Sequence, residues 1–253
     1  MKTLRKRLYE GEHLLGTMVT TFPSPEIAQL LKLCGFDYFI VDCEHSPFSY
    51  REVAQMLAAA QHYGIPAMVR IPEVKREPVL KFMEMGASGL LMPNTDNADM
   101  ARQLVQYAKY APEGRRGISF VRPHANFGQL PDAPQYLAQT NDETILICQI
   151  ESREGVRNID EILAVPGIDV ALIGPYDMSQ DFGLLGQFDH PELVAAFRRV
   201  IEAARSNHKF SGAHLVPPEL LKRWIDEGMT MNMWNCDTGL LMDGARTLGA
   251  LRV

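Results

Sequence analysis

The chain alternates between short apolar runs and longer amphipathic segments. The runs are rich in β-branched and aromatic residues, and the segments after them have helical spacing, so the pattern predicts strand–helix units and a parallel sheet. The eight predicted strands are 14–20, 37–43, 66–71, 89–93, 144–150, 168–174, 210–216 and 229–235. The predicted helices are 24–34, 49–62, 75–85, 96–109, 154–163, 190–206, 217–227 and 237–247.

Local signals support the ends of several of these helices. Ser24 before Pro25 predicts an N-cap residue with proline in the first turn, and the helices predicted at 190–206 and 217–227 also open on proline followed by glutamate. Glycines, which favour the backbone that ends a helix, stand where four helices should stop. They are Gly35, Gly64, Gly86 and Gly228.

Eight such units in 253 residues predict a single-domain (β/α)8 TIM barrel spanning 1–253. A doubly wound open sheet is the competing architecture, and it is less favoured because no GxGxxG follows the first strand. One segment breaks the alternation. Residues 111–143 are long and rich in proline and glycine, and we interpret them as a βα loop of the kind that usually serves function or binding.

Composition excludes several classes of protein. Hydrophobic residues make up 46 % and charged residues 22 %, which is ordinary for a globular chain. No apolar run approaches the roughly 18 residues of a membrane span, and the basic start has no apolar signal-peptide core. With 25 basic and 31 acidic residues the net charge is −6, and no basic block suggests nucleic-acid binding.

The four cysteines lie far apart in the sequence and form no CxxC. This spacing argues against a zinc site or a disulfide framework, so we interpret them as reduced, buried thiols of a cytoplasmic protein. They are Cys34, Cys43, Cys148 and Cys236.

Polar side chains follow several predicted strands, at the end of a barrel where active sites lie. An apolar strand needs no charge at its end, so the coincidence is informative. The residues are Asp42, Glu44 and His45 after the second strand, Arg70 on the third, Gln149 and Glu151 at the end of the fifth, and Tyr176 and Asp177 after the sixth.

Glu151 and Asp177 occupy equivalent points of adjacent units, 26 residues apart. Neighbouring parallel strands run about 5 Å apart, so the two carboxylates could converge. Two hard oxygen ligands without cysteine or histidine suit Mg²⁺ or Mn²⁺, with substrate and water completing the shell. The alternative is that Glu151 lies on the surface and that Asp177 is a turn or N-cap residue.

His45 and Arg70 each allow two interpretations. His45 follows a strand directly and has carboxylates nearby, which suits a general base near neutral pH, whereas an ordinary surface role is favoured for His13, His62, His190 and His208. Arg70 could hold a carboxylate or stabilise an oxyanion, or it could form an ion pair that closes the barrel top. No lysine follows a strand into the expected site, which argues against Schiff-base chemistry.

These residues belong to motifs in which the chain resembles the HpcH/HpaI aldolases, class II, metal-dependent pyruvate aldolases. The resemblance extends from about residue 11 to residue 248. The matching motifs are DxEH at 42–45, VRIP at 69–72, EMGASGLLMP at 84–93, YAPEGRRG at 110–117, QIE at 149–151 and IGPYDMSQDFG at 173–183.

The resemblance implies a role for each matching residue. Glu151 and Asp177 match the metal ligands, with Mg²⁺, Mn²⁺ or Co²⁺ as the ion. Gln149 matches a residue that binds the oxo-acid, with Asp177 also at the substrate. Arg70 matches the arginine that stabilises the pyruvate enolate, and His45 matches the base, with Asp42 beside it.

The implied reaction is reversible cleavage of a 2-oxo-4-hydroxy acid to pyruvate and an aldehyde through a metal-bound enolate. The resemblance also implies a (β/α)8 barrel that forms a homo-oligomer, commonly a hexamer built from dimers, with the site completed partly by a neighbouring subunit. The expected partners are therefore a small oxo-acid, an aldehyde and further copies of the chain.

Several positions depart from the family pattern. Glu84 replaces an aspartate that supports the basicity of the histidine, so a catalytic role for Glu84 would have altered geometry. Tyr176 replaces a small substrate-binding residue and could reshape the aldehyde side of the pocket. Arg122 and His124 could reach a polar substrate tail, although an ordered surface loop is the simpler interpretation.

Two other functions stay open from the sequence. A related barrel lyase could use an acyl-CoA or phosphoenolpyruvate-like donor, for which the adjacent Arg115 and Arg116 give slight support. A non-catalytic barrel could instead bind a metabolite, although the intact set of polar residues at the strand ends argues against it.

Overall fold

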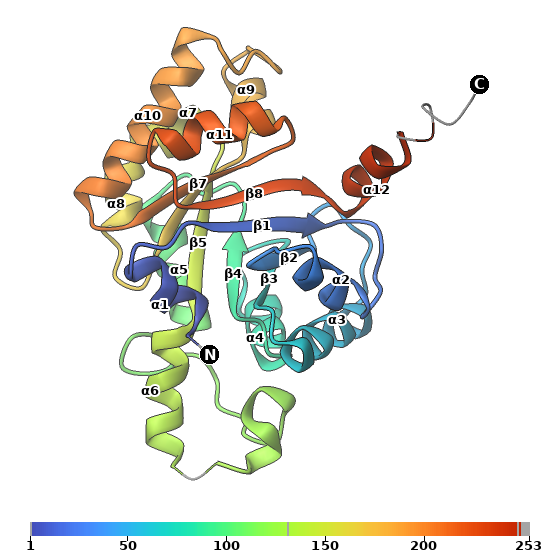
Figure 1. The fold of residues 1–253 in the computed structure, drawn as a ribbon. Coiled ribbons are helices and arrows are strands. Elements are labelled where there is room, and N and C mark those ends of the chain that lie inside the picture. Colours follow the sequence, from blue (N-terminus) through green and yellow to red (C-terminus); the bar gives the residue numbers. More distant parts are fainter. Residues whose placement is uncertain (1, 131, 247, 249–253) are drawn as a thin grey trace.

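Eight parallel strands close into a barrel in which each strand pairs with the next along the chain and the last pairs with the first (Figure 1). The computed structural model describes residues 2–130, 132–246 and 248. The predicted (β/α)8 TIM barrel is confirmed, with each strand within a few residues of its predicted range. The strands are β1 (Leu14–Val19), β2 (Tyr38–Asp42), β3 (Ala67–Arg70), β4 (Gly89–Met92), β5 (Ile145–Ile150), β6 (Val170–Ile173), β7 (Phe210–Leu215) and β8 (Met231–Cys236).

Side chains alternate between two apolar layers because successive residues of a strand point to opposite faces. On β2, Tyr38 and Ile40 pack inside the barrel, whereas Phe39 and Val41 pack outward against the helices. Both faces of each strand are buried, which explains why the strands read as continuous apolar runs rather than alternating ones.

The predicted helices are also confirmed, apart from small shifts at their ends and one split. They are α2 (Ile27–Leu33), α3 (Tyr50–Tyr63), α4 (Arg76–Glu84), α5 (Ala98–Ala108), α7 (Arg153–Arg157), α8 (Ile159–Leu163), α10 (Pro191–Ser206), α11 (Pro218–Asp226) and α12 (Asp237–Arg246). The four glycines expected at helix ends all have positive φ, where glycine is favoured. Within the described ranges, no helix has the length and apolar character that crossing a membrane would require.

Three helices and a 3₁₀ segment were not predicted: α1 (Leu4–Tyr9), η1 (Pro123–Gly128), α6 (Ala133–Glu143) and α9 (Pro175–Asp181). The interpretation of 111–143 as a βα loop is wrong. The segment contains α6, and it joins α5 to β5, so it belongs to the N-terminal end of the strands. Figure 1 shows α6 and the chain before it projecting from the barrel on the side where α1 lies.

Helix α1 closes the N-terminal end of the barrel. Leu4 and Leu8 are buried in the interior cluster. Arg5 Nε donates to Asp169 Oδ1 at 2.9 Å, and the backbone N–H of Leu146 donates to Asp169 Oδ2 at 3.1 Å. The buried Asp169 carboxylate thus links the helix to the start of β5.

Two local predictions fail for identifiable reasons. The Ser24 hydroxyl donates to the carboxylate of Glu26 and does not cap a helix; Glu26 is the N-cap residue and α2 starts at Ile27. Cys34 is exposed rather than buried, because it lies at the solvent-facing C-terminal end of α2. The predicted end of the last helix at residue 247 lies outside the described residues.

Candidate active site

The polar residues expected at the strand ends gather at one end of the barrel, where the strands terminate. We call this end the mouth and define it by Asp42, Arg70, Gln149, Glu151 and Asp177. Asp42 ends β2 and is paired in register with Arg70 at the end of β3. Gln149 lies on β5, Glu151 follows it, and Asp177 lies in the first turn of α9.

Arg70 is held rigidly by Asp42. Nε donates to Oδ1 and Nη2 contacts Oδ2, both at 2.8 Å, in a two-pronged pair with residue exposures of 8 % and 1 %. Burial opposes ionisation of Asp42, but the hydrogen bond and charge of Arg70 outweigh it and lower the pKa of Asp42. The ion pair expected from the sequence therefore exists, and it fixes the guanidinium at the mouth.

Glu44 extends this pair toward β4. Its Oε2 lies 3.1 Å from Nη1 of Arg70, and its Oε1 accepts from the side-chain amide of Asn94 at 3.2 Å. Burial raises the pKa of Glu44, opposed by Arg70 and reinforced by the negative charges of Asp42 and Asp177. Two carboxylates thus contact the guanidinium of Arg70, and with Glu151 and Asp177 nearby the acidic side chains at the mouth outnumber this one arginine.

Glu151 is the most perturbed acid of the mouth. It is 4 % exposed, and burial raises its pKa to about 7, although the backbone N–H of Asn94 donates to Oε1 at 2.6 Å. The negative charge of Asp177 raises the pKa further. A buried carboxylate whose pKa is near 7 lacks a cation in direct contact with it.

The pair Glu151 and Asp177 fits a divalent cation. Asp177 is exposed at the mouth, and it is close enough for its charge to act on Glu151. A cation between two hard carboxylates would remove this repulsion. Among the described residues, no group of three or more His, Cys, Asp or Glu side chains is arranged to hold a metal, so water and substrate would have to complete the coordination shell.

The lack of a side chain at Gly174 makes room for the side chains of Glu151 and Gln149. A Cβ at this position would lie 2.2 Å from Oε2 of Glu151 and 2.7 Å from Nε2 of Gln149, so only glycine allows the close approach. Gln149 Nε2 donates to Oε2 of Glu151 at 2.6 Å. Its buried Oε1 has no hydrogen-bond partner among the described residues, so one polar atom of this amide is unused.

His45 lies at the rim of the mouth rather than beside Asp42. Its side chain is 67 % exposed, and its Nε2 is 3.7 Å from Oε2 of Glu44. Toward His45, Asp42 accepts a hydrogen bond from the backbone N–H, at 3.4 Å, whereas its carboxylate pairs with Arg70. Of the two carboxylates expected near His45, Glu44 is therefore the one next to the ring.

Tyr176 stands at the outer side of the mouth. Its side chain is 57 % exposed, and its ring meets the edge of Phe188 at a centroid distance of 5.1 Å. It directly precedes Asp177, so its hydroxyl and ring are available to a molecule that approaches the carboxylate pair.

Glu84 does not join this group within one chain. It is the last residue of α4, and β4 begins shortly after it, so Glu84 lies at the N-terminal end of the strands. There its carboxylate is 4.0 Å from Arg122, and its carbonyl lies 3.1 Å from Nδ1 of His124. Arg122 and His124 are likewise far from the mouth of their own barrel.

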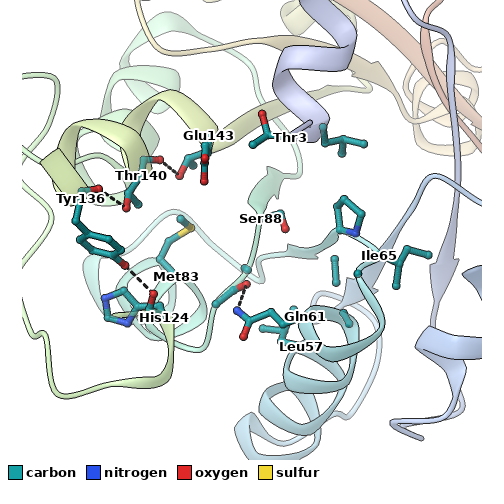
Figure 2. Close-up of a pocket in the computed structure, with 18 of the residues that line it drawn as sticks. Thr3, Leu57, Gln61, Ile65, Met83, Ser88, His124, Tyr136, Thr140 and Glu143 are labelled. Atoms are coloured by element: carbon teal, nitrogen blue, oxygen red, sulfur yellow. Dashed lines mark hydrogen bonds between the residues drawn. The ribbon is translucent and has the colours of Figure 1, made fainter. Parts of the chain in front are cut away.

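The same end contains a cavity of about 340 Å³. Figure 2 shows Tyr136 and Thr140 of α6 and the nearby His124 on one side of it, facing Leu57 and Gln61 of α3. None of the residues that define the mouth lines this cavity, so it is separate from the candidate site.

The adjacent arginines considered for phosphate binding are also at the N-terminal end. Arg116 is buried against the ring of Tyr110, 4.5 Å from its centroid, whereas Arg115 is exposed. They form no basic groove at the mouth, and so they give no support to a nucleotide-containing donor.

Two contributors to the mouth were missed from the sequence, Asn94 and Gly174. Asn94 has φ +49° after β4, which presents its backbone N–H to Glu151 and its side chain to Glu44. An asparagine directly after a strand is a recognisable signal for this backbone conformation. The role of Gly174 depends on a contact between neighbouring strands, which the sequence does not reveal.

A (β/α)8 barrel with charged side chains at the C-terminal ends of its strands is the architecture of an enzyme, and similarity to known proteins identifies the family. Residues 20–244 match the family model described as HpcH/HpaI aldolase/citrate lyase. The chain belongs to this family of carbon–carbon lyases, and it is an enzyme of the class II, pyruvate-type aldolase group.

Three relatives illustrate the similarity. A hydroxypyruvate/pyruvate aldolase of Roseobacter denitrificans is 30 % identical over 251 residues, which cover 99 % of this chain and 96 % of the relative. A 4-hydroxy-2-oxo-heptane-1,7-dioate aldolase of Escherichia coli is 34 % identical over 224 residues, or 88 % and 84 % of the two chains. The crystal structure of an HpcH/HpaI aldolase from Desulfitobacterium hafniense superposes with a TM-score of 0.94 at 31 % identity, covering 99 % of this chain and 97 % of the other.

Proposed function

We propose that this chain is a divalent-metal-dependent aldolase that reversibly cleaves a 2-oxo-4-hydroxy acid to pyruvate and an aldehyde. The observation that carries the proposal is the gathering of the fixed Arg70, the amide of Gln149 and the carboxylates of Glu151 and Asp177 at one mouth. The relatives named above act on small oxo-acids of this kind.

Glu151 and Asp177 would hold the metal ion. The ion supplies a Lewis acid that polarises the 2-oxo group of the substrate. Gly174 leaves the space that the side chains of Glu151 and Gln149 occupy at the mouth. Nε2 of Gln149 donates to Glu151, so the unused atom of its amide is Oε1, which can accept a hydrogen bond from a hydroxyl group of the substrate or from a water molecule.

Arg70 stabilises the charge that develops during cleavage. When the C3–C4 bond breaks, its electron pair stays on the three-carbon fragment and forms the enolate of pyruvate, with negative charge on the former 2-oxo oxygen. Asp42 and Glu44 use only part of the N–H groups of Arg70, and the remainder are available to this oxygen. Because the guanidinium is already fixed, it need not reorganise during the reaction.

His45 removes the proton from the 4-hydroxyl group, directly or through a water molecule, as the aldehyde forms. Its exposed position at the rim suits contact with a substrate that enters from solvent, and the carboxylate of Glu44 lies 3.7 Å from Nε2. Protonation of the enolate at C3 then yields pyruvate. Tyr176 lies where the aldehyde part of the substrate would leave.

Glu84 would contribute to the active site only from another subunit. It lies at the far end of its own barrel, so it could support His45 only across an interface of the homo-oligomer that the family resemblance implies.

The first test is exchange of the methyl protons of pyruvate with solvent, followed by NMR. This reaction requires the enolate but not the natural aldehyde. Metal-free protein should exchange slowly, and addition of Mg²⁺, Mn²⁺ or Co²⁺ should accelerate exchange. Glu151→Ala and Asp177→Ala should abolish the metal-dependent rate while leaving the fold intact, since both side chains lie outside the packed layers.

Exposed acidic residues provide matched controls. Glu154→Ala on α7 and Asp226→Ala on α11 should exchange like the wild type. Metal-dependent exchange at the full rate in Glu151→Ala or Asp177→Ala would contradict the ligand assignment. Absence of exchange in the wild type with every metal would contradict the proposed donor.

A further inference from the structure

Strand β7 contributes a histidine to the inside of the barrel at the mouth. Ala213 and Leu215 pack in the outer apolar layer, whereas Phe210 packs against the interior cluster. Because side chains alternate along a strand, His214 points inward. It is only partly buried, unlike its apolar neighbours on the strand.

His214 lies between the two halves of the candidate site. Ala213 is paired in register with Ile173, so the next residues along the two strands, His214 and Gly174, are neighbours. Gly174 is the residue against which the carboxylate of Glu151 packs. From the other side, the charges of Arg70 and Asp42 both act on the imidazole.

The hydrogen bonding of His214 fixes which ring nitrogen carries the proton. Nε2 lies 2.7 Å from the backbone oxygen of Asn235, and a carbonyl can only accept, so Nε2 bears the hydrogen. Burial, aided by the charge of Arg70, lowers the pKa of His214. The ring is therefore neutral at pH 7, and Nδ1 keeps its lone pair.

Nδ1 has no hydrogen-bond partner within the described part of the chain, and it is not fully enclosed by protein. The mouth thus offers a neutral hydrogen-bond acceptor, fixed in direction by the bond from Nε2 to Asn235. The group that satisfies it must supply a hydrogen. A carboxylate or a carbonyl of the substrate cannot do so, whereas a hydroxyl group can.

We propose that Nδ1 of His214 accepts a hydrogen bond from a hydroxyl group of the substrate, so that this aldolase prefers a reactant carrying a hydroxyl beside the reacting carbon. The inference rests on the proposed aldolase function and specifies its substrate class. The hydroxyl belongs either to the 2-oxo acid donor or to the aldehyde acceptor. A site built around such a contact disfavours an analogue without the hydroxyl, because the bound analogue covers Nδ1 and leaves this acceptor unpaired.

The test compares reactants that differ by one hydroxyl group. Hydroxypyruvate is compared with pyruvate as the donor, and glycolaldehyde with acetaldehyde as the acceptor, in all four combinations. His214→Leu should lower kcat/KM about 10- to 100-fold for one hydroxylated reactant and change it less than about 3-fold for the matched reactant without the hydroxyl. His214→Gln should restore much of the preference, because its amide carries both a donor and an acceptor.

The pair that loses its preference identifies the source of the hydroxyl. Loss with hydroxypyruvate places the contact on the donor, and loss with glycolaldehyde places it on the acceptor. The control is His62→Leu, an exposed histidine at the end of α3, which should leave all four values unchanged.

Two results would overturn the inference without touching the proposed function. An equal loss for all four combinations in His214→Leu, with a lower Tm, would mean that His214 only fixes Asn235 and the end of β8. Unchanged values for all four would exclude His214 from the pocket. A wild type without metal-dependent exchange of either donor would instead defeat the aldolase function itself.

Discussion

At the scale of single residues, the mouth combines one fixed cation with acids in very different states. Asp42 is as buried as Glu151, but Arg70 forms two direct contacts with Asp42 and keeps it ionised, whereas Arg70 acts on Glu151 only through its charge, without a hydrogen bond. The pKa values therefore move in opposite directions, downward for Asp42 and up to about 7 for Glu151. Asp42 serves to fix Arg70, and Glu151 is the carboxylate that gains most from a bound cation.

This contrast predicts how the metal-free protein responds to pH. The pKa of Glu151 in the folded state, about 7, lies above its unfolded value of 4.5, so the stability it contributes is complete below pH 4.5 and is lost as pH rises through 7. Glu151→Gln should remove this loss, which is on the order of 3 kcal/mol. Urea unfolding in EDTA at pH 5 and pH 8 should therefore show a smaller decrease in the variant than in the wild type.

The exposed Glu154 supplies the comparison for this experiment. Glu154→Gln should reproduce the pH dependence of the wild type, because its side chain is not buried. Parallel pH profiles for Glu151→Gln and the wild type would contradict the raised pKa.

The sequence identified most residues of the mouth but not the hydrogen bonds and ion pairs among them. Asp42, Arg70, Glu151 and Asp177 could be found because charge at the end of an apolar strand is conspicuous. The sequence could not show which carboxylate pairs with which cation, because the pairing depends on strand register and on the length of the side chains. Thus Asp42 was expected beside His45, and it binds Arg70 instead.

At the scale of elements, the helices found from the sequence are those with local signals. Helix α3 has a capping box between Ser49 and Glu52, and α10 has His190 at its N-cap followed by proline. Helix α6 was missed because it packs loosely and buries only Asn141 among its residues, so it lacks an apolar stripe. Such a helix is stabilised by its contacts in the folded chain rather than by its own pattern.

One acidic residue joins elements at opposite ends of the sequence. Asp237, at the start of α12, accepts hydrogen bonds from the backbone N–H groups of Thr20, Thr21 and Phe22 at 3.1, 2.9 and 2.8 Å. The Thr20 hydroxyl adds a bond of 2.8 Å. Burial opposes ionisation of Asp237, but these donors outweigh it and lower its pKa, so its contribution to stability is lost as pH falls below the usual range of an aspartate.

Removal of this carboxylate should therefore destabilise the protein strongly. Asp237→Ala leaves the three backbone donors without their partner, and we expect the free energy of unfolding at pH 7 to fall by about 2–4 kcal/mol. Urea denaturation followed by circular dichroism measures the change. Asp226→Ala on α11, whose exposed carboxylate contacts only Lys222, should cost less than about 0.5 kcal/mol, and an equal cost for both variants would refute the role of Asp237.

At the scale of the whole molecule, the two ends of the barrel differ in chemistry. The N-terminal end is closed by α1 and its buried leucines, whereas the mouth carries the carboxylates of Asp42 and Glu44 on Arg70 and, beside them, those of Glu151 and Asp177. Negative charge concentrated at one end destabilises the metal-free fold, and a cation that binds there stabilises the whole barrel because it binds only the folded state.

Added metal should therefore raise the melting temperature. At a concentration 100 times its Kd, Mn²⁺ should add about 2.7 kcal/mol and raise Tm by roughly 5–10 °C. Differential scanning calorimetry with and without metal measures the shift. Glu151→Ala and Asp177→Ala should show little shift, whereas Glu154→Ala should keep all of it; the same shift in all three variants would mean that the metal binds elsewhere.

Closure of the barrel has a consequence for the synthesis of the protein on the ribosome. Strand β1 pairs with β8, and Thr20 beyond β1 binds Asp237, which lies 217 residues further along the chain. Translation proceeds from the N-terminus, so β1 leaves the ribosome long before its partner exists. Until then the growing sheet has two open edges, which invite pairing with other nascent chains. The dependence on chaperones should thus peak just before the last strand emerges, and it should end abruptly once β8 is released.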